Sequence, residues 1–241
     1  MRLRDFKVLT FDCYGTLIDW ETGIVNALRP LLSKLSPGIS KEAALEAFAG
    51  HESAQESETP GMIYSELLSA VHRRLAREWG AKIGESANVA FGQSVGDWPE
   101  FPDSPAALRY LKQYHKLVIL SNVDRASFAR SNKRLGVEFD AIYTAQDIGS
   151  YKPDPRNFSF MLEKLASQGY RKQDILHVAQ SLFHDHAPAN RVGLASAWID
   201  RRHDRQGWGA TMKPESAPRY DFRYASMAEL VRAHQEEQGK G

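Results

Sequence analysis

The sequence predicts an α/β protein built on a parallel sheet, with helices on both faces and an inserted subdomain of helices. Short apolar runs of strand length recur along the chain, and segments with apolar residues at helical spacing separate them. Such alternation is typical of parallel strands joined by helical crossovers, as in a Rossmann-like sheet. Residues 20–90 carry helical patterns alone, so we expect the chain to leave the sheet there and return.

The first strand is expected at residues 8–11, an apolar run with Lys7 before it and Gly15 shortly after it. Asp12 follows this run directly, at the strand end where open α/β sheets bind ligands. Gly15 lets the backbone pass close to a ligand, and Thr16 adds a hydroxyl group. Asp12 is therefore a candidate for chemistry. The alternative is that it caps the following turn.

The helical segment begins near Trp20 and contains three stretches with apolar residues at helical spacing: 26–32, 41–48 and 64–76. Ser40 is a favourable N-cap for the second stretch, and two Pro-Gly pairs separate the three. A proline-rich segment, 96–105, then leads back to the sheet. We expect residues 1–18 and 96–241 to form the main domain and residues 19–95 a helical cap.

Four further runs have strand character: residues 117–120, 141–144, 174–179 and 195–199. An amphipathic helix is expected at 225–238. Polar residues follow three of these runs: Ser121 with Asn122, then Lys152, then Asp185. On its own, Lys152 in a proline-rich turn would be interpreted as a surface residue. Because parallel strand ends converge on one edge, we expect Lys152 and the other polar residues to meet near Asp12.

The residues at these strand ends resemble the four motifs of the haloacid dehalogenase superfamily of hydrolases. Phe11-Asp12 resembles the nucleophile motif, Leu120-Ser121-Asn122 the hydroxyl motif, Tyr151-Lys152-Pro-Asp-Pro the lysine motif, and Val178 to Asp185 the acid motif. The resemblance implies a Rossmann-like core, a cap that closes over the site, and an aspartyl ester intermediate. Tyr14 stands where the phosphatase branch has a second Asp, and in this the chain is similar to the type II 2-haloacid dehalogenases.

Two positions favour carbon–halogen chemistry over phosphoryl transfer. A phosphoester's alkoxide needs a general acid, and Tyr14, with an ordinary pKa of about 10, is poorly suited to that task. A halide leaves without a proton. The superfamily's metal site usually has an Asp where this chain has Gln180, which leaves only Asp12 and Asp185 for Mg²⁺. We therefore expect a hydrolase that needs no cofactor and takes a small anionic 2-haloacid.

The expected mechanism is covalent catalysis in two steps. Asp12 displaces the halide, and water then hydrolyses the resulting ester with Asp185 as base or water positioner. Lys152 keeps Asp12 ionised and pairs with Asp185, while Thr16 and Ser121 orient the carboxylate or the substrate. The substrate contacts are expected from Tyr14, Asn122, Gln180 and His51.

The halide pocket departs from the family pattern. The resemblance implies an arginine from the early cap, and the corresponding segment 48–55 contains none. His51 is our candidate to replace it, with Arg73, Arg74 and Arg77 of a later helix as alternatives. Further departures are Phe158 in place of a tyrosine after the lysine, and Gln180 and Leu182 in place of Ser and Asn before the last acid.

The single cysteine and three histidines lie beside the motifs. Cys13 cannot form an intramolecular disulfide, which is consistent with a reducing compartment, and we expect a buried filler rather than a reactive thiol. His184 and His186 flank Asp185, and His177 lies upstream. We expect them to orient Asp185 or bond to backbone groups. The alternative is a transition-metal site.

Charge and composition limit the partners. The 31 basic and 30 acidic residues argue against a nucleic-acid or membrane surface as partner. The N-terminus lacks the apolar region of a secretion signal, and no run approaches membrane-spanning length. We expect a cytoplasmic protein, with a homodimer as a further expectation by analogy.

Two rival functions stay open. The first is a Mg²⁺-dependent phosphatase with Asp12 and Asp185 as metal ligands, which strong metal dependence would reveal. The second is a non-catalytic binding protein on the same scaffold. Joint retention of Asp12, Lys152 and Asp185 argues against the second, but fold alone does not decide between these functions.

Overall fold

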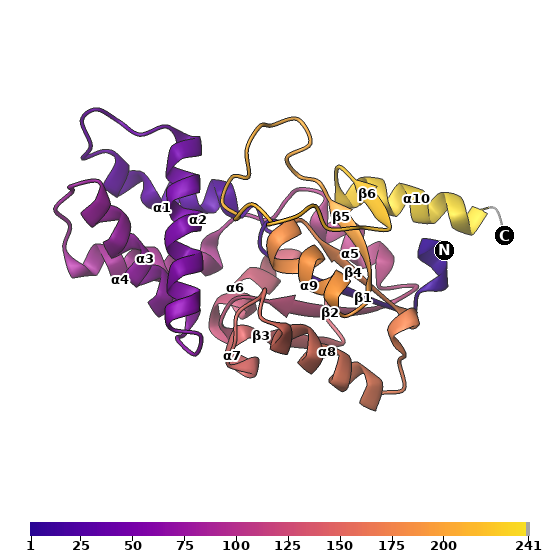
Figure 1. Ribbon diagram of the computed structural model, residues 1–241. Helices are drawn as coiled ribbons and strands as arrows, with labels where there is room; N and C mark the ends of the chain where they lie inside the picture. The colour runs from indigo at the N-terminus through magenta and orange to yellow at the C-terminus, as the bar shows by residue number, and fades with distance from the viewer. Residues whose placement is uncertain (240–241) are drawn as a thin grey trace.

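A six-stranded parallel sheet forms the centre of the protein in the computed structural model, which describes residues 1–239 (Figure 1). The strand order is β3-β2-β1-β4-β5-β6, and every neighbouring pair is parallel. The strands are β1 (Val8–Phe11), β2 (Lys116–Ser121), β3 (Ala141–Thr144), β4 (Ile175–Ala179), β5 (Ala195–Ile199) and β6 (Phe222–Tyr224). The order reverses between β1 and β4, which places the ligand crevice of such a sheet beside Asp12.

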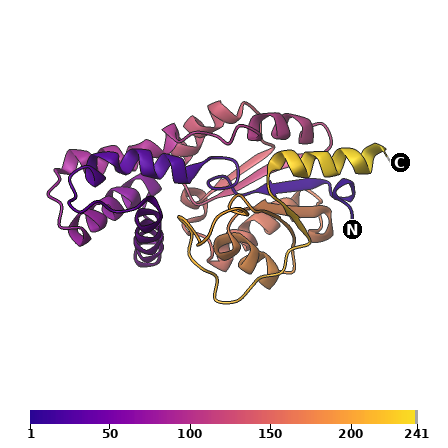
Figure 2. The ribbon, with the colours of Figure 1, turned by 90° about the horizontal axis from the view of Figure 1, so that it is seen from above.

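Helices cover both faces of the sheet (Figure 2), as the sequence predicts. One face packs against α5 (Ser104–Leu111), α6 (Arg125–Leu135) and α10 (Met227–Gly239), and the other against α8 (Pro155–Ser167) and α9 (Ala187–Arg191). Successive strand residues point to opposite faces, so Leu9 and Phe11 join the first cluster and Val8 the second. Shorter elements complete this part: α7 (Ala145–Ile148), η1 (Leu3–Asp5), η2 (Ser94–Asp97), η3 (Lys172–Asp174) and η4 (Leu182–His186).

Four helices lie to one side of the sheet and are called the helical block here (Figures 1 and 2). They are α1 (Trp20–Leu32), α2 (Lys41–Glu58), α3 (Tyr64–Glu78) and α4 (Glu85–Gln93). Ser40 caps α2 as expected, because its Oγ accepts a hydrogen bond from the Ala43 amide at 3.2 Å. None of the helices within residues 1–239 combines the length and apolarity that crossing a bilayer requires.

Several elements were not predicted individually from the sequence, among them α4 and β6. The helix α4 buries Phe91 as its one apolar side chain, and it forms against α3, where Gly92 approaches the Ser65 carbonyl so closely that a Cβ would lie 2.0 Å from it. The strand β6 has three residues, Phe-Arg-Tyr, and pairs only with β5 at the sheet edge. Both elements depend on contacts with distant parts of the chain, and the local spacing of apolar residues does not reveal such contacts.

The turn after β1 requires glycine at position 15. Gly15 has φ +93°, and a Cβ there would lie 2.9 Å from Trp20 Nε1. The Gly15 amide bonds to the Ile18 carbonyl at 2.8 Å, and the Leu17 amide bonds to the Cys13 carbonyl at 2.7 Å. This tight turn folds back on itself and brings the Thr16 hydroxyl to the carboxylate of Asp12.

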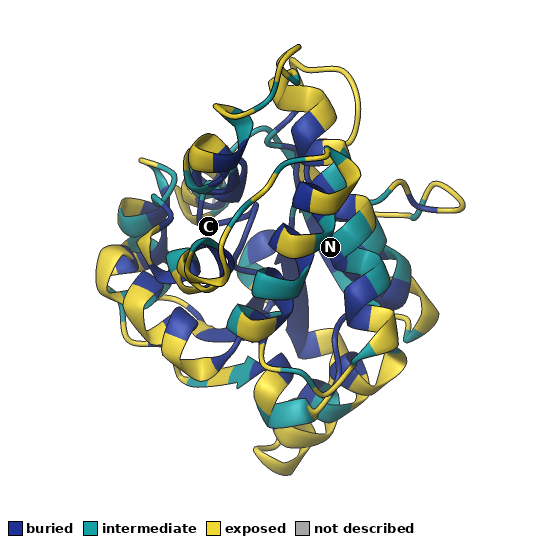
Figure 3. Ribbon diagram, turned by 90° about the vertical axis from the view of Figure 1, so that its left-hand side faces the viewer, coloured by how far each residue is buried: buried dark blue, intermediate teal, exposed yellow. Residues whose placement is uncertain are grey.

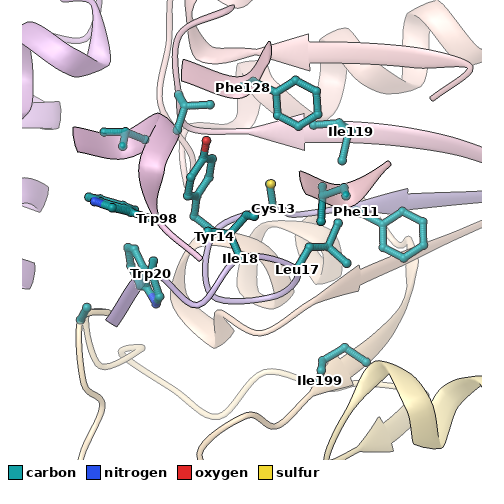
Figure 4. Close-up of a cluster of buried hydrophobic side chains, with 14 of the residues drawn as sticks. Phe11, Cys13, Tyr14, Leu17, Ile18, Trp20, Trp98, Ile119, Phe128 and Ile199 are labelled. Atoms are coloured by element: carbon teal, nitrogen blue, oxygen red, sulfur yellow. The ribbon is translucent and has the colours of Figure 1, made fainter. Parts of the chain in front are cut away.

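Buried residues gather in the strands and on the inner sides of the helices (Figure 3). Beneath the β1 turn, Cys13 and Tyr14 lie in a cluster that includes Phe11 and Trp98 (Figure 4). Tyr14 and Trp98 pack edge to face, with ring centroids 5.8 Å apart. Cys13 is fully buried, as expected for a filler, and burial raises the pKa of its thiol well above the ordinary value.

Candidate active site

Lys152 lies at the centre of the polar cluster at the sheet edge. Its Nζ donates to Asp12 Oδ1 at 3.0 Å, to Asp185 Oδ1 at 2.7 Å and to the Leu120 carbonyl at 2.9 Å. The residue is 1% exposed, so the surface interpretation of this lysine is wrong. Burial lowers the pKa of Lys152, but the two carboxylates outweigh it and hold the pKa above its ordinary value. The buried ammonium therefore stays charged, with all three hydrogens in use.

Asp12 receives hydrogen bonds on both oxygens. Thr16 donates to Oδ2 at 2.7 Å, and Lys152 donates to Oδ1. Burial raises the pKa of Asp12 above its ordinary value, Lys152 opposes this, and Asp185 adds to it. The two donors therefore favour the carboxylate form that a nucleophile needs, in a site where burial opposes it.

Asp185 is held on one oxygen and has no partner on the other. Its Oδ1 accepts from Lys152 and from His177 Nε2 at 2.9 Å, while its buried Oδ2 has no hydrogen-bond partner within the described chain. Burial acts to raise the pKa of Asp185, but Lys152 and His177 lower it below the ordinary value. The result is an ionised carboxylate with one oxygen available to a water molecule or a ligand.

The three histidines near Asp185 make different contacts, and His177 is the one that bonds to Asp185. His177 Nδ1 lies 2.8 Å from Thr10 Oγ1, so the threonine donates to it and fixes the tautomer that donates to Asp185. His186 lies 3.0 Å from the Ala179 carbonyl and 2.9 Å from Ser196 Oγ. His184 approaches Ser181, and burial lowers its pKa to about 4, which keeps the ring neutral.

Ser121 ends β2, Asn122 follows it, and the two side chains make different contacts. Asn122 Oδ1 accepts from the Lys152 amide at 2.7 Å, and its Nδ2 donates to the Lys152 carbonyl at 2.9 Å and to Glu56 Oε1 at 3.0 Å. Its side chain thus fixes the lysine loop and reaches α2. Ser121 is 2% exposed, and its Oγ has no partner among residues 1–239.

Tyr14 reaches the site without a free hydroxyl. It lines the cavity described below, but its hydroxyl is hydrogen-bonded to Ser131 Oγ at 2.7 Å. Burial raises the pKa of Tyr14 well above its ordinary value, so the phenol keeps its proton. The structure therefore places an apolar ring, rather than an acid, on the side where phosphatases of the resembled family have their second Asp.

Two of the expected substrate contacts do not line the cavity. Gln180 bonds through its backbone amide to Thr16 Oγ1 at 2.9 Å, and its side chain lies against Gly15. His51 pairs with Glu78 of α3, because one step along α2 turns its side chain about 100° away from the face that carries Glu52. The alternative arginines also lie elsewhere: Arg73 pairs with Glu85 and Arg74 with Glu58.

A small cavity of about 30 Å³ lies between the sheet edge and the helical block. Asp12, Lys152 and Asp185 line it from the sheet, and α2 contributes Glu52 and Glu56. The sequence analysis did not select these glutamates. A signal was present, because both continue the buried face of α2 begun by its apolar residues Leu45 and Phe48.

The carboxylates of the site do not fit Mg²⁺. The ammonium of Lys152 already joins Asp12 and Asp185, and Thr16 occupies the second oxygen of Asp12. Mg²⁺ requires near-octahedral oxygen ligands, and Gln180 supplies no carboxylate. In the described part of the chain, no group of three or more His, Cys, Asp or Glu side chains is arranged to hold a metal ion.

Comparisons with known proteins agree with the motifs. A family model described as haloacid dehalogenase-like hydrolase matches residues 6–179. An (S)-2-haloacid dehalogenase of Pseudomonas putida is 22% identical over 212 residues, covering 83% of this chain and 87% of the relative. The (S)-2-haloacid dehalogenase H-109, also of Pseudomonas putida, is 25% identical over 211 residues, covering 83% and 88%.

A solved structure shares the fold. The L-2-haloacid dehalogenase of Xanthobacter autotrophicus matches with a TM-score of 0.76 at 18% identity, covering 95% of this chain and 98% of that one. At this identity the likeness shows a common fold. Together with the family model, it confirms the resemblance predicted from the strand-end motifs.

Proposed function

The chain belongs to the haloacid dehalogenase-like hydrolases, and on that premise we propose that it hydrolyses the carbon–halogen bond of a small 2-haloacid. The observation that carries this proposal is the buried cluster in which Lys152 joins Asp12 and Asp185. Both relatives named above are 2-haloacid dehalogenases, and this similarity supports the same reaction. The oxygen ligands that Asp12 and Asp185 could offer to Mg²⁺ give no support to a phosphatase.

In the first step, a carboxylate oxygen of Asp12 attacks the carbon that bears the halogen. A carbon–oxygen bond forms, the carbon–halogen bond breaks, and the electron pair leaves on the halide. Lys152 and Thr16 hold the carboxylate of Asp12 in one orientation, which favours an in-line approach. A halide needs no proton to leave, which suits a site where the Tyr14 hydroxyl is bonded to Ser131.

In the second step, water attacks the carboxyl carbon of the Asp12 ester. The unpartnered Oδ2 of Asp185 is the group we assign to accept the proton of this water. The bond between the Asp12 carboxyl carbon and the ester oxygen breaks, and the departing alkoxide takes the proton held by Asp185 and leaves as the 2-hydroxy acid. The second proton of the water passes to solvent, and the Asp12 carboxylate is restored with one oxygen from water. His177 holds Asp185 in place for this step.

The substrate carboxylate can be received beside Asp12. The backbone amides of Cys13 and Tyr14 donate no hydrogen bond to any described residue, and Ser121 Oγ is also without a partner. The helical block closes the opposite side of the cavity with α2. We therefore assign residues 19–95 the role of a cap over the reacting atoms.

The test is release of chloride from the two enantiomers of 2-chloropropionate, with EDTA present. We expect the wild-type protein to release chloride from one enantiomer and Asp12→Asn to lose at least about 10³-fold in kcat. Full release by the variant would overturn the covalent mechanism. Release from neither enantiomer by the wild-type protein would overturn the substrate class.

A further inference from the structure

Two buried glutamates face the reacting groups from α2. Glu52 is 3% exposed and Glu56 is 6% exposed, and both line the active-site cavity. They are four residues apart on the helix, so they lie on one face, one turn from each other. Tyr64 donates a hydrogen bond to Glu52 Oε1, and Asn122 donates to Glu56 Oε1. The second oxygen of each carboxyl group accepts no hydrogen bond from residues 1–239.

Carboxyl groups outnumber cationic side chains around the cavity. Four carboxyl groups line it, from Asp12, Asp185, Glu52 and Glu56, and the single lysine is the only ammonium or guanidinium among the lining residues. All three hydrogens of that ammonium are taken by groups of the protein itself. Buried carboxyl groups are costly unless they are paired. Among the described residues that line the cavity, those of α2 therefore include two carboxyl groups and no cation.

Two further buried atoms in the same cavity have no partner. Ser121 Oγ and His184 Nε2 belong to side chains at least nine-tenths buried, and neither makes a hydrogen bond within the described residues. His184 Nε2 lies 3.8 Å from Glu56 Oε2, too far for a hydrogen bond. Unpaired buried polar atoms of this kind are rare in folded proteins, and here they surround the space where a substrate would lie.

We propose that the end of the substrate facing α2 carries a protonated primary amine, which binds between Glu52 and Glu56. This inference rests on the proposed function and names its substrate class: small 2-haloacids with an amino substituent, of net charge zero. An ammonium has three donors and no acceptor, which matches the free oxygens of the two glutamates. The cavity is small, at about 30 Å³, which favours a short carbon chain.

The ionisation of the two glutamates depends on the group that lies between them. Burial raises the pKa of Glu52 to about 8, and burial together with Glu52 raises the pKa of Glu56 well above its ordinary value. An ammonium between them stabilises both carboxylates by direct ion pairing. An alkyl group at the same position leaves the glutamates unpaired, and a bare carboxylate can bind only to their protonated form.

The first experiment compares chloride release from 3-amino-2-chloropropionate and 2-chloropropionate at pH 7, with spontaneous release subtracted. We expect kcat/KM of the wild-type protein to be at least tenfold higher for the amino compound. Glu52→Gln and Glu56→Gln keep the shape of the side chains and should bring this ratio toward one. Glu58→Gln, an exposed position on the same helix, is the matched control and should leave the ratio unchanged. A wild-type ratio at or below one would overturn the inference.

The second experiment separates this inference from the proposed function. Isothermal titration of the wild-type protein with β-alanine and propionate measures recognition without turnover. We expect β-alanine to bind at least tenfold more tightly, with the difference lost in Glu56→Gln. Selective binding of β-alanine without chloride release from any substrate would reject dehalogenation and support the amine site. Chloride release together with equal binding of β-alanine and propionate would support dehalogenation and reject the amine site.

Discussion

Asn122 bonds to the backbone of Lys152 on both sides, with its Oδ1 2.7 Å from the Lys152 amide and its Nδ2 2.9 Å from the Lys152 carbonyl. The same amide group donates to Glu56 of α2. One side chain thus fixes the loop that carries the central ammonium and joins it to the helical block. The position of the ammonium therefore depends on a residue outside the charged cluster.

Asn122→Ala should lower both stability and activity. Loss of these hydrogen bonds leaves buried backbone groups unpaired, so we expect a decrease of about 1–3 kcal/mol in the free energy of unfolding. We also expect kcat to fall at least tenfold, because the backbone of Lys152 is no longer held in the position that directs its ammonium to Asp12. Urea denaturation and chloride release measure the two effects. Asn190→Ala is the matched control, since Asn190 bonds to both sides of Arg219 away from the cavity. An equal loss of kcat in both variants would contradict a specific role.

Lys152→Met should destabilise the fold strongly at neutral pH. The substitution keeps an aliphatic chain but leaves the carboxylates of Asp12 and Asp185 buried without their cation. Removal of one partner from a buried ion pair costs about 3–5 kcal/mol. Urea denaturation at pH 7 measures the loss, with the exposed Lys133→Met as control. A loss below 1 kcal/mol would show that the buried ammonium contributes little to stability.

Hydrolysis in ¹⁸O-labelled water should label Asp12. The ester of the proposed mechanism is opened by water at the Asp12 carboxyl carbon, so one labelled oxygen enters the protein. After several turnovers on 2-chloropropionate, mass spectrometry of the peptide that contains Asp12 should show added mass. A protein incubated without substrate is the control. Label in the product alone would mean that water attacks the substrate directly.

Chelation of metals should leave chloride release unchanged. The ammonium of Lys152 already binds one oxygen each of Asp12 and Asp185, the two carboxylates that the phosphatase alternative needs for the metal. Rates with EDTA and with added Mg²⁺ should therefore agree within about twofold. A clear stimulation by Mg²⁺ would favour the phosphatase alternative, and phosphate esters would be the substrates to examine next.

Acid should destabilise the protein below pH 6.5, in part through His186. Burial lowers the pKa of this histidine from 6.5 to about 4, so between these values the unfolded chain binds a proton that the folded protein does not. The free energy of unfolding is unaffected by this group above pH 6.5 and falls as the pH decreases toward 4, by roughly 3 kcal/mol.

The measurement is urea denaturation at pH 7.5 and pH 5. His186→Gln can still donate to the Ala179 carbonyl and accept from Ser196, but it does not titrate. We expect it to lose less stability between the two pH values than the wild-type protein. His203→Gln, at an exposed position, should behave like wild type. If His186→Gln loses as much stability between pH 7.5 and pH 5 as the wild-type protein, groups other than His186 cause the acid destabilisation.

Much of the sheet and part of the candidate site could be predicted from the sequence. The runs at residues 8–11, 141–144 and 195–199 match β1, β3 and β5 at both ends, because each is a short run rich in apolar and β-branched residues. Asp12, Lys152 and Asp185 each follow such a run. Parallel topology then brings them to one edge without further information, and the structure places them within hydrogen-bond distance.

The sequence by itself determined the fold class and the order of the polar residues at the strand ends, because both depend on local patterns that repeat along the chain. Only the tertiary structure decided that Lys152 is buried, that His51 turns away, and that Glu52 and Glu56 face the reacting groups. The surroundings of a polar side chain are set by elements distant in sequence. From the sequence alone, a glutamate on α2 is expected to be exposed to solvent, because the sheet edge that covers it is distant in sequence.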